Sequence, residues 1–417
     1  MSPSLALREA LVAAIGFEAQ DTPLGNLSWG RGTLDGRTVR AAFVDNRIAS
    51  GSLGAAEAER LSALLRVAAA ERAPLVLFLD SAGARVSEGL RALGAFRGLY
   101  RAALDAVRGG MPLACVLGRN CYGGASMLAM LGSARLFSPE TRLAMSGPAI
   151  IASTAGTTPG DEMFQAMAEA AMSPAARRKV NPRNHVWAEG EDPVPFLREA
   201  LQPPGDLLGR WREQHESMAS RFEGARADIP WESLRRRDLE KLYDGGYAVQ
   251  ESHGLVTGEG VRGGEARAVI GLVGSAPLGL ARAWRLSDLA WRHRDKPPAR
   301  IDVLLDCASH APRLDDERAV LSDFIVDMAC SLTAVATSGA RVELIVLGKA
   351  GGGVYVALAG PAQRVSSVYG ADIQVLPASA VAAILGAGAD AVPSFQEYRA
   401  AGVADEEIKL GLVPGAA

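Results

Sequence analysis

Two stretches of the sequence join an apolar run to a turn that contains glycine. The run Leu75 to Leu79 leads into Asp-Ser-Ala-Gly-Ala-Arg at Asp80 to Arg85. The run Leu113 to Leu117 leads into Asn-Cys-Tyr-Gly-Gly at Asn120 to Gly124. A helical pattern follows each turn, so backbone N–H groups at each helix start should lack intrahelical partners. Two such turns, side by side in a sheet, can donate N–H groups to one oxyanion such as an enolate oxygen.

The second half of the sequence repeats this pattern. Ile301 to Asp306 matches the first apolar run with its aspartate, and Leu344 to Lys349, followed by three glycines, matches the second run. A glycine-rich hairpin signal at Gly258 to Gly264 likewise matches one at Gly30 to Gly36. The paired stretches lie roughly 225 to 230 residues apart in the same order. We interpret the chain as an internal duplication of one βαβ-rich domain.

Hydrophobic spacing predicts the elements that position the turns of the first half. A strand and three helices are expected, in that order, at Thr38 to Val44, Ala55 to Arg72, Leu90 to Val107 and Ala125 to Leu131. The sequence then becomes rich in Pro, Arg and Glu. Helices are predicted there at Asp161 to Met172, Val194 to Leu201, Leu207 to Phe222 and Trp231 to Tyr243. The expected domains are 1–205 and 251–417, with a helical linker over 206–250.

Composition and charge narrow the classes of partner, site and cellular location that fit the sequence. The 417 residues carry a net charge of −3, which gives no general attraction to nucleic acid or membrane. The four cysteines form no CxxC pair and show no ligand-like spacing to the five histidines, so no metal site is expected. Met1 to Phe17 is predicted to be an amphipathic helix unlike a secretory signal, and no apolar run is long enough to span a bilayer. A cytoplasmic protein is expected.

The first turn also carries a family motif. Asp80 to Gly89 resembles the acidic-Ser-Gly-Gly-Ala-Arg-x-x-Glu-Gly motif of the carboxyltransferase branch of the crotonase superfamily, and Phe137 to Ile151 resembles that family's strand ending in Gly-Pro-x-Val-Ile. Within that branch the chain is similar to biotin-independent malonate decarboxylase, whose β subunit has a turn like Asn120 to Gly124 and whose γ subunit resembles the second half. The chain therefore resembles these two subunits joined. The resemblance implies an α/β fold of two tandem crotonase-like β-β-α superhelix domains.

The same resemblance implies the chemistry. A malonyl thioester would lose CO2 to give the acetyl thioester, with the enolate oxygen held by N–H groups of the first-half turns and the carboxylate lying against the second-half turns. A proton would come from His310, Cys121 or Tyr122. The candidate site residues are Gly83, Ala84, Cys121, Tyr122, Gly123, Gly124, Ser309, His310, Gly352 and Gly353. No metal or chain-bound cofactor is implied, and the acyl group would be carried on coenzyme A or a carrier-protein prosthetic group.

Departures from the family pattern leave alternatives open. The family's glycine is absent at Ser309, and neither a four-cysteine zinc ribbon nor a Met-Lys-Met biotin-acceptor segment occurs in the chain. The missing glycine makes a non-catalytic scaffold subunit one alternative. A biotin-dependent acyl-CoA carboxyltransferase, which passes the carboxyl group to or from biotin on another protein, is the other.

Purely structural interpretations also exist for single residues. Glycines at βα turns can merely cap helices and pack strands. His310 can be a surface loop histidine, Cys121 a small buried hydrophobe, and Arg85 a residue that pairs with Glu88 or Asp80 to shape the turn. The other histidines are interpreted as surface residues, namely His185, His215, His253 and His293.

Partners follow from the resemblance and from surface patterns. The resemblance implies an acyl carrier protein or coenzyme A thioester and allows an acyltransferase subunit. A homodimer is predicted because the apolar helix faces at Leu90 to Tyr100 and Phe324 to Leu332 exceed the needs of one core. The basic run Arg235 to Arg237 is either a solvated helix face or a dock for an acidic carrier protein.

Overall fold

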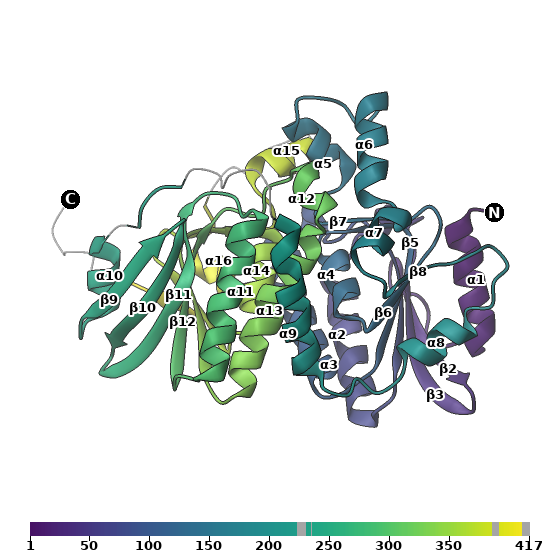
Figure 1. Cartoon of the computed structure of the whole chain (residues 1–417), viewed down its shortest axis with the longest axis horizontal. Helices are drawn as coiled ribbons and strands as arrows, with labels where there is room; N and C mark the ends of the chain where they lie inside the picture. The colour runs from purple at the N-terminus through teal and green to yellow at the C-terminus, as the bar shows by residue number, and fades with distance from the viewer. Residues whose placement is uncertain (223–230, 235, 386–391, 411–417) are drawn as a thin grey trace. The chain divides into compact units, whose positions relative to one another are not determined.

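A computed structural model describes residues 1–222, 231–234, 236–385 and 392–410 of the chain (Figure 1). The chain divides into two compact units. The first consists of Met1–Leu207, Pro312–Val326 and Ala383–Gly386, and the second of Leu208–Ala311, Asp327–Ala382 and Ala387–Ala417. The first unit therefore takes in a short segment from the second half of the sequence, which bears on its site.

The first unit is built on one mixed sheet with the strand order β1-β2-β3-β4-β5-β6-β8, and β7 pairs with β5. The strands are β1 (Glu18–Ala19), β2 (Leu27–Leu34), β3 (Arg37–Val44), β4 (Leu75–Ser81), β5 (Leu113–Tyr122), β6 (Ala134–Phe137), β7 (Arg142–Ala144) and β8 (Asn184–Val186). Pairing is antiparallel from β1 to β3 and parallel from β3 onward. Every residue of β4 is buried, as expected for a central parallel strand with both faces covered.

Helices cover both faces of this sheet (Figure 1). On one face α1 (Pro3–Ile15) and α8 (Val194–Ala200) share a core with alternate residues of β3, β4 and β5. On the other face lie α2 (Ala55–Glu71), α3 (Leu90–Arg108) and α4 (Gly124–Leu131). The remaining helical elements of the unit are η1 (Ala49–Gly51), η2 (Val86–Glu88), α5 (Pro148–Thr154), α6 (Glu162–Met172), α7 (Pro174–Val180) and α12 (Leu314–Arg318).

The sheet of the second unit repeats the order of the first, as β9-β10-β11-β12-β13-β14-β16 with β15 paired to β13. Its strands are β9 (Tyr247–Ser252), β10 (Leu255–Arg262), β11 (Glu265–Ser275), β12 (Arg300–Cys307), β13 (Arg341–Gly351), β14 (Arg364–Val368), β15 (Asp372–Gln374) and β16 (Glu406–Ile408). Its helices are α9 (Leu207–Met218), η3 (Ala219–Phe222), α10 (Arg236–Leu242), α11 (Leu280–Asp295), α13 (Leu321–Thr337), α14 (Gly352–Ala359), α15 (Ala378–Leu385) and α16 (Phe395–Ala400). Of these, α9, α13 and α15 each include residues assigned to the first unit. The predicted α/β class is confirmed, and so is its division into two similar domains, because each unit has a mixed sheet with the same strand order.

A buried aspartate fixes the end of β4. The Asp80 carboxylate accepts hydrogen bonds from the backbone N–H of Asn120 (3.0 Å) and from the Ser4 hydroxyl (2.8 Å). Gly118 makes room for it, because a Cβ at residue 118 would lie 2.5 Å from the Asp80 side chain. Burial raises the pKa of Asp80. The carboxylate thus joins β4, β5 and α1 at the edge where the glycine turns begin.

The second unit has an equivalent aspartate at the end of β12. Asp306 accepts from the backbone N–H of Lys349 and from the Ser275 hydroxyl, both at 2.8 Å. Gly348 again leaves room for the carboxylate. The register between β12 and β13 shifts at this point, as it does between β4 and β5. The two halves therefore share a local irregularity as well as a strand order, which supports the duplication.

The premise for a homodimer does not hold in the structure. Leu93, Phe96, Leu99 and Tyr100 are buried within the single chain, and so are the apolar residues of Phe324–Leu332. These helix faces therefore leave no excess apolar surface, and the homodimer stays a prediction without that support.

Replacing Asp80 by alanine tests the bracing role of this carboxylate. The change leaves buried donors of Asn120 and Ser4 unsatisfied and should lower the free energy of unfolding by about 2–4 kcal/mol. Urea denaturation followed by circular dichroism measures it. The same substitution at exposed Asp105, which pairs with Arg108 at 3.5 Å, should cost less than about 1 kcal/mol. Equal effects at the two positions would contradict the assignment.

Candidate active site

The two glycine turns of the first unit lie against each other. Gly83 has φ +93°, and a Cβ on it would lie 2.7 Å from the carbonyl oxygen of Tyr122 and 3.5 Å from Cα of Gly123. An L side chain is disfavoured at this φ and has no space at this contact. The turn after β4 and the turn after β5 are therefore in backbone contact, as the sequence predicted.

Two backbone N–H groups in these turns remain available. The N–H of Gly123 is already used, since it donates to the carbonyl of Ala144 (3.1 Å). For Ala84 and Gly124, the hydrogen bonds found among the described residues include none from the backbone N–H. Gly124 is the first residue of α4, where a helix has no internal acceptor for that group. Both residues are partly exposed, so a ligand oxygen can approach them.

The two glycines of the second turn have different roles. A Cβ at Gly124 would lie 2.3 Å from the Phe96 ring, so this glycine is needed where α4 packs on α3. A bulky residue there would disturb the core and would not test the turn. At Gly123, with φ +54°, the nearest atom to an added Cβ is the carbonyl oxygen of Met145, at 3.8 Å. A Cβ at the partly exposed Gly123 would therefore meet only this ordinary van der Waals contact.

Three other polar residues beside these turns, Cys121, Tyr122 and Arg85, are buried or paired. Cys121 is fully buried, and burial raises the pKa of its thiol well above the usual range, which fits a small hydrophobe. Burial also raises the pKa of Tyr122, whose ring packs against Gly147. Arg85 pairs with Glu57 (2.6 Å) and Glu88 (3.0 Å), so it shapes the turn as expected, although Asp80 is not its partner.

The second unit brings its own two turns together, but in a different form. Ser309 occupies the place of Gly83, because its carbonyl accepts from Leu278 as that of Gly83 accepts from Leu53. The Ser309 hydroxyl would lie 3.0 Å from a Cβ at Gly352, whose φ is +53°. Ser309, His310 and Gly352 are buried, whereas Gly353 is partly exposed. The Ser309 side chain therefore covers the second-unit turn at Gly352, whereas the equivalent turn of the first unit is not covered in this way.

The structure changes the expectations for two histidines. Burial lowers the pKa of His310 to about 4, so its imidazole is neutral at pH 7 and does not supply the imidazolium expected of a proton donor. His215 is not a surface residue, because only 3% of it is exposed and its Nδ1 lies 2.7 Å from the Asp327 carboxylate. Stacking on Trp284 completes its packing.

Sequence reasoning missed a buried acid in the segment that joins the first unit from the second half. Glu317 of α12 is fully buried, and its Oε1 accepts from the backbone N–H groups of Met145 (3.0 Å) and Ser146 (3.1 Å). Its Oε2 lies 3.8 Å from Nη2 of Arg177, which is also fully buried. In the sequence the residue ends an acidic run that is typical of a solvated helix, so no local signal marks it.

The environment of Glu317 favours its protonated form. Burial is the main cause and raises its pKa to about 7, against the opposing effects of Arg177 and of the two N–H donors, while nearby Asp316 adds to the rise. Arg177 itself donates to the carbonyls of Leu143 and of Glu317, the latter at 2.5 Å. This cluster ties α7, β7 and α12 together beside the Gly123 turn.

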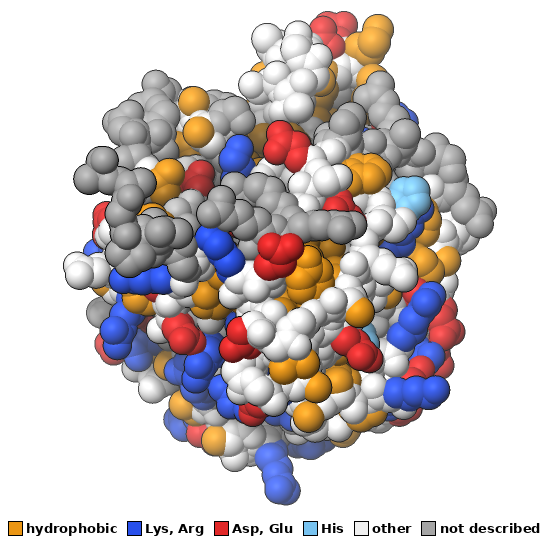
Figure 2. Space-filling view, turned by 90° about the vertical axis from the view of Figure 1, so that its left-hand side faces the viewer, with side chains coloured by type: hydrophobic (Ala, Val, Ile, Leu, Met, Phe, Trp, Pro, Cys, Tyr) orange, Lys and Arg blue, Asp and Glu red, His pale blue; other side chains and the backbone are white. Residues whose placement is uncertain are grey.

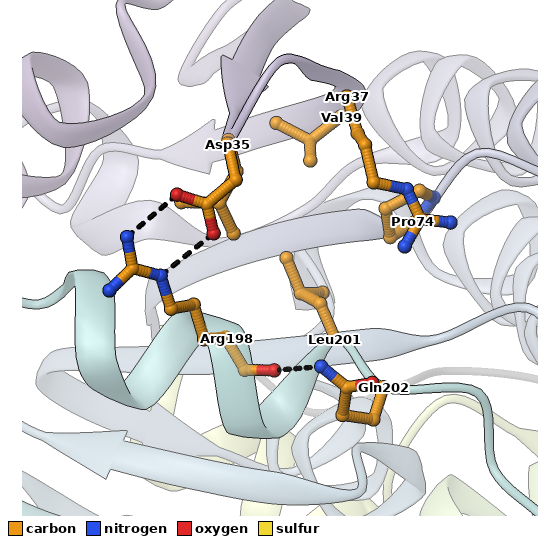
Figure 3. Close-up of a pocket in the computed structure, with 8 residues that line it drawn as sticks. Asp35, Arg37, Val39, Pro74, Arg198, Leu201 and Gln202 are labelled. Atoms are coloured by element: carbon orange, nitrogen blue, oxygen red, sulfur yellow. Dashed lines mark hydrogen bonds and ion pairs between the residues drawn. The ribbon is translucent and has the colours of Figure 1, made fainter.

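A small pocket of about 60 Å³ lies elsewhere in the first unit (Figure 3). Its lining includes Leu34, Pro74 and Leu201, and Arg198 at its rim forms an ion pair of 2.7 Å with Asp35. Pro74 precedes β4 and Asp35 closes the β2–β3 hairpin, so the pocket is at the amino end of β4. Ligands of open α/β sheets bind at the carboxyl ends, where the glycine turns lie.

None of the described helices combines the length and the apolarity needed to cross a membrane. Within the same ranges, no group of three or more His, Cys, Asp or Glu side chains is arranged to hold a metal ion.

Part of the chain is similar to a known protein domain. Residues 6–173 match the family model of the carboxyl transferase domain. The chain is 27% identical over 197 residues to the methylmalonyl-CoA carboxyltransferase 12S subunit of Propionibacterium freudenreichii subsp. shermanii, covering 47% of this chain and 36% of that protein. It is 31% identical over 179 residues to the methylmalonyl-CoA decarboxylase subunit alpha of Veillonella parvula, covering 42% and 33%.

Solved structures also resemble the chain. A Pseudomonas malonate decarboxylase hetero-tetramer, crystallised in complex with malonate, gives a TM-score of 0.44 at 20% identity and covers 54% of this chain and 91% of that chain. The chain spans about a third of the length of the two curated relatives. The matched residues 6–173 include both glycine turns of the first unit, so this part of the chain is similar to a carboxyl transferase domain.

Replacing Glu317 by glutamine should remove a pH dependence of stability. The folded-state pKa of about 7 exceeds the ordinary 4.5, so the folded chain binds more protons between these values. Stability from this group is therefore present below about pH 4.5 and lost as pH rises through about 7. Relative to Glu317→Gln, the wild type should lose roughly 3 kcal/mol of unfolding free energy between pH 4.5 and 8.

Urea denaturation at several pH values measures this difference. Glu162→Gln, at an exposed residue of α6, is the matched control and should follow the wild type. Parallel pH curves for the wild type and Glu317→Gln would refute the titration of Glu317.

Proposed function

We propose that the first unit decarboxylates a malonyl thioester, presented on coenzyme A or on an acyl carrier protein, to the acetyl thioester. One observation carries the proposal: the two glycine turns are in backbone contact, and the N–H groups of Ala84 and Gly124 are left for a ligand. The thioester carbonyl oxygen would accept from these N–H groups. They would then stabilise the negative charge that the oxygen gains.

The reaction needs no cofactor from the chain. The bond between the thioester α-carbon and the carboxylate breaks, its electron pair moves into the thioester as an enolate, and CO2 leaves. Preorganised N–H donors lower the barrier because they interact more strongly with the enolate than with the neutral carbonyl. A proton then adds to the α-carbon and gives the acetyl thioester. The carboxylate-binding role expected of Ser309, His310, Gly352 and Gly353 remains a prediction.

A biotin-dependent carboxyltransferase is the second candidate, favoured by the match of residues 6–173 to a carboxyl transferase domain. That reaction uses the same enolate but passes the carboxyl group to biotin on another protein. One matched relative is named as a methylmalonyl-CoA carboxyltransferase subunit and another as a methylmalonyl-CoA decarboxylase subunit, so these names do not decide between the two candidates. The discriminating question is whether CO2 is released without biotin.

Incubating the purified chain with malonyl-CoA, and separately with malonyl acyl carrier protein, answers this question. The proposal expects CO2 and acetyl thioester in the absence of biotin, measured by gas release and mass spectrometry. Carboxyl transfer only after addition of a biotinylated carrier supports the second candidate. No turnover under either condition with a folded chain supports the scaffold alternative.

A methyl group at Gly123 should obstruct the thioester. Gly123→Ala places a Cβ at the open side of the turn and should lower kcat/KM by roughly 100-fold, the scale of a small misplacement of substrate. Gly110→Ala is the matched control, because Gly110 also has positive φ (+89°) and open space but follows α3, at the amino end of β5. Similar losses in both variants would attribute the effect to backbone strain.

Docking of an acidic acyl carrier protein on a basic surface is also part of the proposal. The basic run that would dock an acidic carrier protein includes Arg235 and the side chains of Arg236 and Arg237, which lie outside the described residues. The described part of the face in Figure 2 shows basic and acidic side chains interspersed. A glutamate triple substitution at residues 235–237 should raise KM for the malonyl carrier protein alone, measured against malonyl-CoA, because steering depends on charge.

A further inference from the structure

The segment Pro312–Val326 touches the Gly123 turn from two sides. The Ser322 hydroxyl lies 2.9 Å from that of Ser126, which donates to the carbonyl of Gly123 (2.8 Å). On the other side Glu317 holds the peptide groups that follow β7. The segment belongs to the first unit although it comes from the second half of the sequence. It therefore braces the open turn without forming it.

The contact through Glu317 reaches the open side of Gly123. The carboxylate accepts from the N–H groups of Met145 (3.0 Å) and Ser146 (3.1 Å). The carbonyl oxygen of Met145 is the atom that borders the space beside Gly123, and Ala144 accepts from the Gly123 N–H (3.1 Å). Loss of the carboxylate would free the Ala144–Ser146 backbone to shift against Gly123.

The charged groups that face Glu317 do not neutralise it fully. Arg177 of α7 is the facing cation, with Nη2 at 3.8 Å, which is beyond hydrogen-bond distance. On α12 itself, Asp316 adds a negative charge that Arg313 pairs at 2.9 Å. From β7 and α6, Arg142 and Glu169 pair with each other at 3.1 Å near the surface.

We propose that Glu317 is a positioning residue for the open turn, which fixes the Met145–Ser146 peptides beside Gly123 and opposes an enolate there whenever it is ionised. The proposal rests on the proposed function for its effect on rate, but the positioning itself does not. A negative carboxylate that holds the peptides beside Gly123 would raise the barrier to an enolate at this turn, because the fully buried Glu317 is screened poorly by water. A neutral carboxylic acid keeps the hydrogen bonds and removes that repulsion.

The direction of the pH effect follows. The pKa of Glu317 is about 7, so the neutral form is present below pH 7 and the ionised form above it. Wild-type kcat should fall by about 10- to 100-fold between pH 6 and pH 9, the size expected for a unit charge nearby. Glu317→Gln imitates the neutral form, so its kcat should match the wild type at pH 6 and stay level to pH 9.

The experiment measures kcat and KM for malonyl-CoA decarboxylation by the full chain from pH 5.5 to 9, with Glu162→Gln as a control that retains the wild-type profile. Loss of the alkaline fall in Glu317→Gln, with KM unchanged, supports the proposal. An unchanged alkaline fall in that variant, or a kcat at pH 6 more than about 100-fold below the wild type, overturns it.

A second measurement needs no activity. Hydrogen exchange of the Met145 and Ser146 amides should be slow in the wild type and in Glu317→Gln, and at least about tenfold faster in Glu317→Ala, which has no acceptor. Unchanged exchange in the alanine variant overturns the positioning role. If neither the wild type nor any variant turns over malonyl-CoA, but the Met145 and Ser146 amides still exchange faster only in Glu317→Ala, the proposed function fails while the positioning role of Glu317 stands.

Discussion

The site of the first unit depends on one close approach, the contact between Gly83 and the carbonyl of Tyr122. Any side chain at residue 83 would collide with that carbonyl, so the two turns can meet only through glycine in a left-handed conformation. The contact also requires that both strands end at the same level. Asp80 ensures this, because its carboxylate spans from β4 to the N–H of Asn120 and occupies the space that Gly118 leaves free. The accessible N–H groups are a consequence of this packing.

Comparison of the two units shows how one scaffold supports two different turn pairs. The second unit keeps the strand order, the register shift and the aspartate, which is Asp306. It differs at Ser309, whose hydroxyl covers Gly352 and whose φ is not positive. The open turn pair is thus retained where glycine is retained, at Gly83. The second half contributes instead the segment Pro312–Val326, which packs within the first unit. The two units therefore share the sheet, while their equivalent turns differ in form.

The sequence predicts the elements well where spacing alone decides them. The helix expected at Ala55 to Arg72 is α2, and the buried run from Leu75 is β4, because apolar periodicity follows from which faces are covered. The burial of a polar residue by partners that are distant in the sequence cannot be predicted from local spacing. His215 and Glu317 lie in polar stretches, yet each is buried against groups more than 100 residues away in sequence. The short strand β8 (Asn184–Val186) was missed for the same reason, since its pairing with β6 defines it.

Three carboxylates near the glycine turns accept hydrogen bonds from backbone N–H groups, whereas other buried carboxylates, such as Asp302 and Glu343, pair with arginines. Asp80, Asp306 and Glu317 each accept from peptide N–H groups at the carboxyl ends of the parallel strands. Such donors are plentiful there because strands end and helices begin, and the partial positive charge of the peptide groups favours an anion. An enolate oxygen would be one more anion in this setting. What distinguishes its place is that no internal carboxylate of the described residues takes the N–H groups of Ala84 and Gly124. The same physical preference that braces the turns therefore supports the proposal that a ligand oxygen binds at Ala84 and Gly124.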